Sequence, residues 1–295
     1  MSFHWNPDPI IAELGSIELR WYGVCFAIGI LWGATVLPRY YKQRGFGEEH
    51  ANNLSIWIPL CMIIGAHAVH MIFYDTQVLV RFWRTPDWDH LLPILDVRSG
   101  LASHGGGLGC IFAVWAYARA KKLNFFELVD ATMLAAVWVF PWVRIGNFVN
   151  SEILGMPASV PWAVIFDQID QTPRHPTQLY EAALGFALIG IAVWLNRKHA
   201  QRMRPGAMFF TLLGLYFVAR FIVEFWKEHQ TPEPFSDVIT TGQWLSLPIF
   251  LTCGLVLLVS KRHGLLTPPD PDQRWWERAA TTADDTAGDP APKTS

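Results

Sequence analysis

Polar side chains suited to binding an anion occur directly after a long apolar run, Leu134 to Trp142. On a continuous helix, Arg144, Asn147 and Ser151 would share one face, with Glu152 beside it. Such a segment must be enclosed by protein or water, or the helix must break near Gly146. An arginine enclosed with amides and a carboxylate is typical of a site for an anionic group. The alternative is a structural clamp that holds a loop against the helices.

A second polar stripe lies within the apolar run 207–225. Tyr216, Arg220 and Glu224 are spaced four residues apart and therefore share one face of a helix. An arginine in the middle of a membrane span costs about 2.5–3.5 kcal/mol on insertion scales, so it normally faces a partner or a cavity. We therefore expect Arg220 to face a site, with an internal Arg220–Glu224 pair as the alternative.

A histidine precedes three consecutive glycines at the start of another apolar run. His104 is followed by Gly105, Gly106 and Gly107. Each glycine costs a helix roughly 1 kcal/mol relative to alanine, and such a run is tolerated where a backbone or a ligand comes close. Because an imidazole exchanges protons near neutral pH, His104 is a candidate catalytic base. The alternative is a hydrogen-bonded structural histidine.

Metal and redox chemistry are not indicated. His67 and His70 lie three residues apart on one helical face, but no carboxylate accompanies them. The four cysteines lie inside apolar runs and form no CxxC pair, which indicates small core residues. The sequence therefore predicts no metal site and no cofactor. A net charge of -2 with no basic patch argues against nucleic-acid binding.

The elements that position these residues are expected to be membrane-spanning helices. Of the 295 residues, 52% are hydrophobic and only 16% are charged, whereas soluble proteins carry roughly 25% charged residues. Uncharged runs of about 20 residues recur, which is the length of a helix that crosses a bilayer. We predict an all-α polytopic membrane protein with a bundle of about seven transmembrane helices. The expected spans are 21–37, 54–73, 100–118, 128–143, 179–195, 207–225 and 244–259.

Basic residues follow the first, third, fifth and seventh expected spans. The positive-inside rule therefore places the N-terminus outside and the C-terminus in the cytoplasm. The segments 75–98, 144–178 and 227–242 then lie outside, where they form an arm and head segments, and Trp83 and Trp88 suit the headgroup level. We expect a transmembrane catalytic domain at 1–262 and a disordered cytoplasmic tail at 263–295, rich in Pro, Asp, Thr and Ala.

Over residues 15–262 the chain resembles the prolipoprotein diacylglyceryl transferase family of the bacterial inner membrane. The resemblance is carried by Arg144-Ile145-Gly146-Asn147-Phe148-Val149-Asn150-Ser151-Glu152 with Gly155, which we call the fingerprint. Supporting matches are Arg20 to Gly23, His104 to Gly106, Arg174 to Glu181, and Tyr216 with Arg220 and Glu224. The resemblance implies transfer of the diacylglyceryl group of phosphatidylglycerol to the lipobox cysteine in the signal peptide of a prolipoprotein. A thioether forms and glycerol phosphate leaves.

The chemistry of this transfer suggests a role for each candidate residue. Only a few per cent of a free thiol is ionised at neutral pH, so a base must help, and His104 is the candidate. The thiolate attacks the glyceryl carbon that carries the phosphate, while Arg144 and Arg220 stabilise the departing phosphate oxygen. Glu152 and Glu224 are expected to orient the arginines. The candidates for substrate binding are Tyr22, Asn147, Asn150, Glu152, Gly155, His175, Tyr216 and Glu224.

Four positions depart from the usual pattern of the family. His67 stands where an arginine is usual, an aromatic residue is usual near His70, Ser151 stands where glycine is common, and Ser103 stands where a bulkier apolar residue often precedes the histidine. These departures leave open a divergent paralogue with another lipid donor. Buried arginines and helix-breaking glycines would also fit a lipid or anion transporter, although no inverted repeat is visible. An inactive scaffold would leave the polar residues unexplained.

Overall fold

A computed structural model describes residues 3–15, 17–97, 100–228, 239–263 and 266. The chain divides into two compact units, one formed by residues 1–40 and 130–295 and the other by residues 41–129. Residues 267–295, most of the expected disordered tail, lie outside the described residues, as does most of the expected outer segment 227–242.

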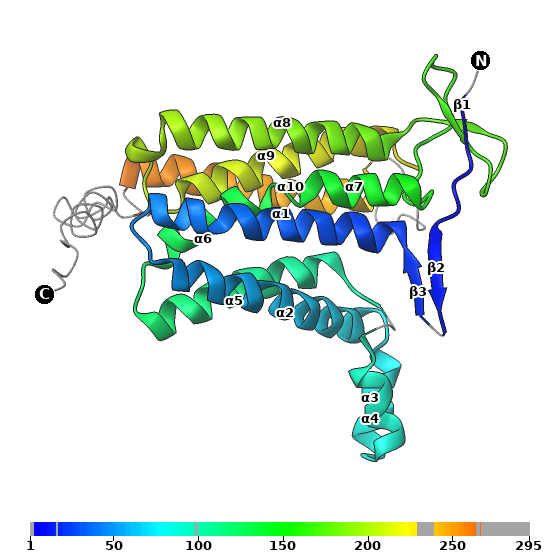
Figure 1. Ribbon diagram of the computed structural model, residues 1–295, viewed down its shortest axis with the longest axis horizontal. Coiled ribbons are helices and arrows are strands. Elements are labelled where there is room, and N and C mark those ends of the chain that lie inside the picture. The colour runs from blue at the N-terminus through cyan, green and yellow to red at the C-terminus, as the bar shows by residue number, and fades with distance from the viewer. Residues whose placement is uncertain (1–2, 16, 98–99, 229–238, 264–265, 267–295) are drawn as a thin grey trace, which may run out of the picture. The chain divides into compact units, whose positions relative to one another are not determined.

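The first unit is built mainly from long helices (Figure 1). They are α1 (Trp21–Gln43), α6 (Phe125–Ala136), α7 (Phe140–Val149), α8 (Thr177–Lys198), α9 (Ala207–Val223) and α10 (Thr241–His263), with 3₁₀ turns η2 (Ala200–Arg202) and η3 (Glu224–Trp226). Helix α7 packs on α8, α8 on α9, and α9 on α10. Gly185 of α8 allows the first contact, because a Cβ there would lie 3.0 Å from the backbone nitrogen of Pro141. This packing places the polar residues of α7, α8 and α9 next to one another.

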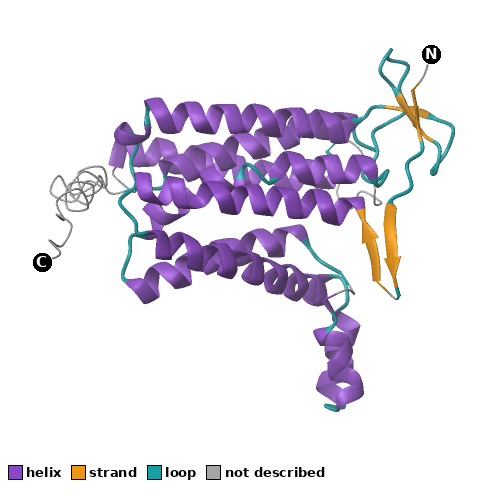
Figure 2. Ribbon diagram, in the orientation of Figure 1, coloured by secondary structure: helices purple, strands orange, loops and turns teal. Residues whose placement is uncertain are grey.

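Two small sheets cap the end of this unit at which α7 finishes (Figure 2). Strand β1 (Phe3–Trp5) pairs in parallel with β4 (Val164–Phe166), and β4 pairs antiparallel with β5 (Pro173–Arg174). Strands β2 (Ile10–Leu14) and β3 (Ile17–Arg20) form a hairpin that leads into α1. A small apolar core ties the first sheet to the end of α7. It consists of Phe148, Val164 and Phe166, with Trp5 and Leu154 packed against it.

The second unit pairs α2 (Glu48–Phe73) with α5 (Ser103–Lys121) and carries an arm of two short helices, α3 (Thr76–Arg84) and α4 (Trp88–Leu95). The close backbone approach predicted from the glycine run is confirmed, because a Cβ on Gly105 would collide with the carbonyl oxygen of Gly65. Helix packing thus accounts for this glycine. His67 connects α2 to the arm, with its Nε2 2.6 Å from the carbonyl oxygen of Ile94. Trp83 and Trp88 are both exposed on the arm.

The all-α polytopic fold class is confirmed, but the count of seven spans is wrong. Among the described residues, six helices are long and apolar enough to cross a membrane. They are 21–43, 48–73, 125–149, 177–198, 207–226 and 241–261. The expected third span is α5, whose glycine-rich first turn and charged last turn make it less apolar than the others. An odd number of spans therefore no longer supports placing the termini on opposite sides.

The span 125–149 is the most enclosed of the six. Within an apolar stretch of 18 residues in this span, 61% of the residues are buried, compared with 17–33% in the corresponding stretches of the other five spans. It consists of α6 and α7 with a turn at residues 137–139 between them, so the expected span 128–143 is two helices in succession. A segment that carries Arg144 and Asn147 needs this enclosure, because lipid cannot satisfy their polar groups.

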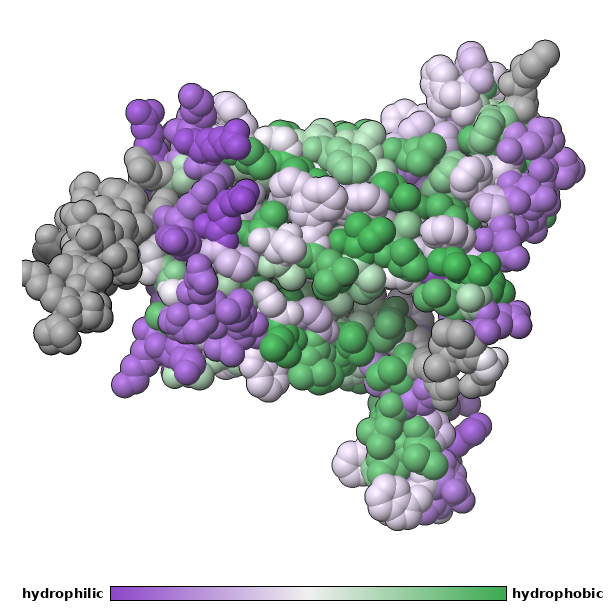
Figure 3. Space-filling view, in the orientation of Figure 1, coloured by the Kyte–Doolittle hydropathy of each residue, from purple (hydrophilic) through white to green (hydrophobic). Residues whose placement is uncertain are grey.

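Basic side chains gather at the end of the first unit opposite the sheets, where Figure 3 shows a hydrophilic surface. They lie in the last turn of α8, between α8 and α9, and near the end of α10: Arg197, Lys198, Arg202, Arg204 and Lys261. Between the two ends, the exposed surface of the helices is mainly apolar, as expected where lipid surrounds the protein.

Candidate functional site

The fingerprint forms the end of α7 and a tight reversal after it. The helix continues through Gly146 to Val149, and the chain then turns at Ser151 and Ile153, which both have a φ of 55°. Ser151 therefore does not share a helical face with Arg144, as it would on a continuous helix, because the helix ends three residues after Gly146. The turn directs Glu152 back toward α7. A backbone hydrogen bond from Glu152 N to the carbonyl oxygen of Asn147, 2.9 Å long, closes this reversal.

Glu152 is the centre of a hydrogen-bond network made by the fingerprint itself. Its Oε2 accepts from Asn147 Nδ2 at 3.1 Å, and its Oε1 accepts from Asn150 Nδ2 at 3.0 Å. Asn147 Oδ1 in turn accepts from Arg144 Nη1 at 3.3 Å. Gln178 of α8 donates to the backbone carbonyl of Glu152 at 2.7 Å. Glu152 thus orients Arg144 through Asn147 rather than by a direct ion pair.

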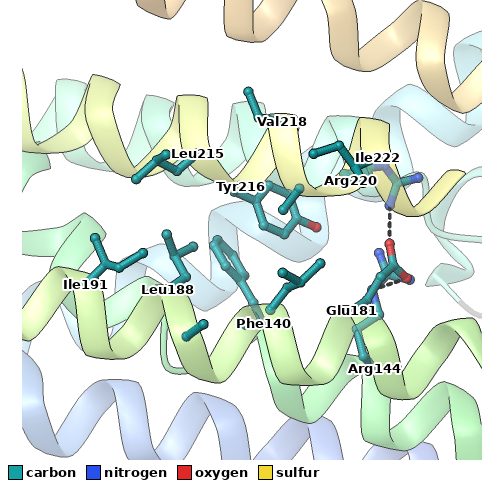
Figure 4. Close-up of a pocket in the computed structure, with 14 residues that line it drawn as sticks. Phe140, Arg144, Glu181, Leu188, Ile191, Leu215, Tyr216, Val218, Arg220 and Ile222 are labelled. Carbon is teal, nitrogen blue, oxygen red and sulfur yellow. Dashed lines mark ion pairs between the residues drawn. The ribbon is translucent and has the colours of Figure 1, made fainter.

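Glu181 of α8 joins the two arginines predicted from the sequence (Figure 4). Its Oε2 lies 3.1 Å from Arg144 Nε, and its Oε1 lies 3.9 Å from Arg220 Nη1. Lys227 Nζ lies 2.9 Å from the same Oε1 and 3.3 Å from Glu224 Oε2. We call these five residues the charged cluster. The alternative of an internal Arg220–Glu224 pair is therefore wrong, since Glu224 pairs with Lys227 and Arg220 with Glu181.

A cavity of about 260 Å³ opens beside the charged cluster, between α8 and α9. Arg144, Glu181 and Arg220 lie at one end of it in Figure 4, and Leu188 and Ile191 lie toward the other. The ring of Tyr216 separates the two parts with its hydroxyl directed to the charged end. Phe140 supports that ring, with a distance of 4.4 Å between the ring centroids. The cavity therefore offers cations at one end and an apolar wall over the rest of its length.

The remaining candidates on this unit lie around the fingerprint. Tyr22, in the first turn of α1, packs on α7 so closely that a Cβ on Gly146 would lie 3.0 Å from its Cδ2. Gly155 approaches His175 so closely that a Cβ there would collide with the carbonyl oxygen of His175. His175 Nδ1 lies 3.0 Å from the hydroxyl oxygen of Tyr180. Gly155 and His175 therefore shape the loop beside the cluster.

Arg174 fastens this loop to the chain that leaves α9. It is 7% exposed, and its guanidinium contacts Asp170 Oδ2 at 2.6 Å, Glu228 Oε1 at 2.9 Å and the carbonyl oxygen of Gly155 at 3.3 Å. The hydrogen bond from Arg174 lowers the pKa of the Asp170 carboxyl, and a backbone hydrogen bond from Thr172 acts in the same direction. Asp170 therefore stays ionised at neutral pH and keeps Arg174 in place.

His104 belongs to the second unit, where it is an exposed residue of the first turn of α5. The structure thus brings together the candidates from α1, α7, α8 and α9, while the assignment of His104 as the base stays a prediction. The glycine at position 105 is explained by its contact with α2, so it lends no separate support to a ligand at that place.

Comparison with known proteins identifies the family of this site. A family model described as prolipoprotein diacylglyceryl transferase matches residues 9–260, which is most of the chain. The chain belongs to the prolipoprotein diacylglyceryl transferase family. Its relatives include a phosphatidylglycerol–prolipoprotein diacylglyceryl transferase of Tolumonas auensis, 38% identical over 86% of this chain and 96% of the relative. Proteins of the same name from Bacteroides fragilis and Chloroherpeton thalassium are each 34% identical, over 88% and 89% of this chain and 95% and 96% of the relatives.

Two members of the charged cluster were not among the residues chosen from the sequence. Glu181 ends a segment that resembles the family, and its signal was an acidic residue close to the start of an otherwise apolar helix. Lys227 follows the apolar run 207–225 and looks like an ordinary loop residue. Only its spacing of three residues from Glu224 hinted at a pair.

The turn at Ser151 yields a stability prediction. Ser151 adopts a left-handed φ of 55° and is buried, a conformation that glycine reaches without the steric cost paid by other residues. We expect Ser151→Gly to raise the free energy of unfolding by about 1 kcal/mol. Thermal unfolding in detergent micelles, with Ser260→Gly on α10 as the control that should not stabilise, measures this effect. An unchanged or lower unfolding temperature for Ser151→Gly would contradict it.

Proposed function

We propose that the protein transfers the diacylglyceryl group of phosphatidylglycerol to the lipobox cysteine thiol of a prolipoprotein signal peptide. In this reaction the cysteine sulfur forms a bond to the glyceryl carbon, and the bond from that carbon to the phosphate oxygen breaks. The thiol proton goes to a base, and glycerol phosphate leaves. The observation that carries the proposal is the amphipathic cavity, which has two arginines at one end and an apolar wall along α8 and α9. The names of the relatives support the choice of both substrates.

The charge of the cluster favours a donor with a single negative charge. Arg144, Arg220 and Lys227 supply three positive charges, and Glu181 and Glu224 supply two negative charges, which leaves an excess of one positive charge. An uncompensated charge in a buried network is costly. A phosphodiester carries one negative charge and would neutralise the excess positive charge of the cluster. A phospholipid whose headgroup carries its own cation has no net negative charge and would leave the excess positive charge in place.

We assign the roles within this reaction as follows. Arg144 and Arg220 bind the phosphate and stabilise the charge that develops on its departing oxygen, in a site where burial strengthens such interactions. Asn147, Asn150 and Tyr22 position the headgroup or the peptide backbone, and Glu152 holds the two amides in place. Tyr216 borders the glyceryl region, Gly155 and His175 shape the loop, and His104 accepts the thiol proton.

We further propose the inner membrane of a bacterium as the location, with the site end of the first unit and the N-terminus outside and the C-terminus in the cytoplasm. The basic residues at the opposite end of the first unit support this orientation by the positive-inside rule. The lipid donor then reaches the site from within the membrane, along the apolar wall of the cavity.

The direct test is a transfer assay with purified protein, micelles containing phosphatidylglycerol, and a synthetic lipobox peptide. We expect mass spectrometry to detect a diacylglyceryl adduct on the peptide, and none when the peptide cysteine is replaced by serine. If the folded protein binds phosphatidylglycerol but forms no adduct, the proposed donor or reaction is wrong. Repeating the assay with other phospholipid headgroups then distinguishes a paralogue with another donor from a protein without transferase activity.

A further inference from the structure

Lys227 is a buried lysine that contacts both carboxylates of the charged cluster. The residue is 5% exposed, and its Nζ lies between Glu181 Oε1 and Glu224 Oε2 at 2.9 Å and 3.3 Å. Lysine is almost never fully buried unless it is paired, because removing an ammonium group from water is costly. Its burial therefore indicates a fixed role for the charge rather than a surface residue that happens to lie close.

The backbone fixes Lys227 in this place. The chain leaves α9 through the 3₁₀ turn η3, which ends with a hydrogen bond from Lys227 N to the carbonyl oxygen of Glu224, 3.2 Å long. Lys227 then forms an antiparallel bridge with Gly155 at the end of the fingerprint. On either side, Met156 N donates to the carbonyl oxygen of Trp226 at 2.8 Å, and Glu228 N donates to that of Leu154 at 3.0 Å. The fingerprint loop thus holds the lysine from outside the apolar helices.

Lys227 and Arg220 compete for one oxygen atom. Both point to Glu181 Oε1, but the lysine Nζ lies 2.9 Å from it and the arginine Nη1 lies 3.9 Å from it. Because the attraction between charges falls with distance, the lysine is the stronger partner of this oxygen. Without it, Glu181 would be neutralised by Arg144 and Arg220 alone. Those are the two groups that the phosphate of the donor needs.

We propose that Lys227 is a positioning residue that binds Glu181 and Glu224 and so leaves the guanidinium group of Arg220 available to the donor phosphate, beside Arg144. Lys227 itself need not contact the substrate. This inference rests on the proposed function for the identity of the donor, but the charge argument applies to binding of the lipid and does not require the transfer step. It can therefore fail or hold independently of that step.

The test compares three variants of the full chain: Lys227→Met, Lys227→Arg, and the double variant Lys227→Met with Glu181→Gln, which also removes the carboxylate that Lys227 shares with the two arginines. Lys227→Met removes the excess positive charge, whereas the double variant restores it, with two cations and one carboxylate remaining. We expect Lys227→Met to weaken phosphatidylglycerol binding and raise its KM about tenfold. Lys227→Arg and the double variant should recover most of this loss, and the KM for the peptide should change little in all three.

Binding is read from the rise in unfolding temperature as the mole fraction of phosphatidylglycerol increases, with Lys198→Met at the exposed end of α8 as the matched control. If Lys227→Met does not fold, the double variant supplies the binding comparison, because it keeps the net charge that the cluster has in the wild type. The inference is overturned if the folded double variant still binds tenfold more weakly than the wild type, or if Lys227→Met binds normally. A wild-type protein that binds lipid without forming the adduct would instead refute the proposed function and leave the binding comparison valid.

Discussion

Replacing Arg144 by methionine is expected to lower kcat/KM for the transfer of diacylglyceryl about 10²–10³-fold, the usual loss when a buried group that stabilises transition-state charge is removed. Arg144 is held from two sides, by Glu181 Oε2 at 3.1 Å and by Asn147 Oδ1 at 3.3 Å. This leaves its position fixed before any substrate arrives. A fixed cation does not have to reorganise as charge develops on the departing phosphate oxygen. Arg144→Lys should recover only part of the loss, because an ammonium lacks the planar fork that holds two partners.

The measurement is single-turnover transfer from phosphatidylglycerol to a lipobox peptide, with thermal unfolding as a check on the fold. Arg197→Met is the matched control, since Arg197 is exposed at the other end of α8. If Arg144→Met unfolds at the wild-type temperature and retains at least about a tenth of the wild-type rate, Arg144 does not stabilise the leaving phosphate. If the variant is less stable, the variant Arg144→Lys carries the comparison, because it keeps the charge opposite Glu181.

Local contacts within the fingerprint could be predicted from the sequence, and contacts between helices could not. Arg144 and Asn147 lie three residues apart on α7, and that spacing alone indicated their contact. The convergence of Arg144 with Arg220 depends on α8 lying between α7 and α9, which places Glu181 midway between them. The spacing of residues along each helix does not determine this order of packing. The chemical types suggested a shared anion site, but the carboxylate that joins the arginines came from the structure.

The turn after α7 shows a limit of helical periodicity. A continuous helix would place Ser151 beside Arg144, whereas the chain leaves the helix after Val149 and adopts left-handed conformations at Ser151 and Ile153. Residues other than glycine rarely adopt these conformations, so neither serine nor isoleucine signals such a turn. The strain is offset by the return of Glu152 to Asn147 and Asn150, which the reversal makes possible.

The count of spans and the small sheets were missed for different physical reasons. Helix α5 is long enough to cross a membrane, but its glycines allow close contact with α2 and make the helix less hydrophobic. Hydropathy alone therefore does not determine whether α5 is a membrane span. Strand β1 pairs with β4 across more than half of the chain, a contact that no local pattern of residues 3–5 indicates. Trp5 fixes this pairing in space, since its Nε1 donates to the carbonyl oxygen of Phe148 at 3.0 Å. The end of the fingerprint helix is thereby attached to the N-terminal strand.

Replacing His104 by glutamine is expected to lower kcat about 10²–10⁴-fold near neutral pH, the range associated with loss of a general base. The effect should depend on pH in a defined direction. A free thiol has a pKa near 8.5, so raising the pH from about 7 to 9 turns most of the peptide cysteine into thiolate without help from the protein. The deficit of His104→Gln relative to the wild type should therefore shrink as the pH rises. A residue that only positions the substrate would give a deficit that is the same at each pH.

The measurement is kcat against pH for both proteins at saturating phosphatidylglycerol, with His199→Gln as the control, because His199 caps the end of α8 opposite the site. A wild-type turnover for His104→Gln would exclude His104 as the base. A large deficit that does not change with pH would make it a positioning residue of the second unit.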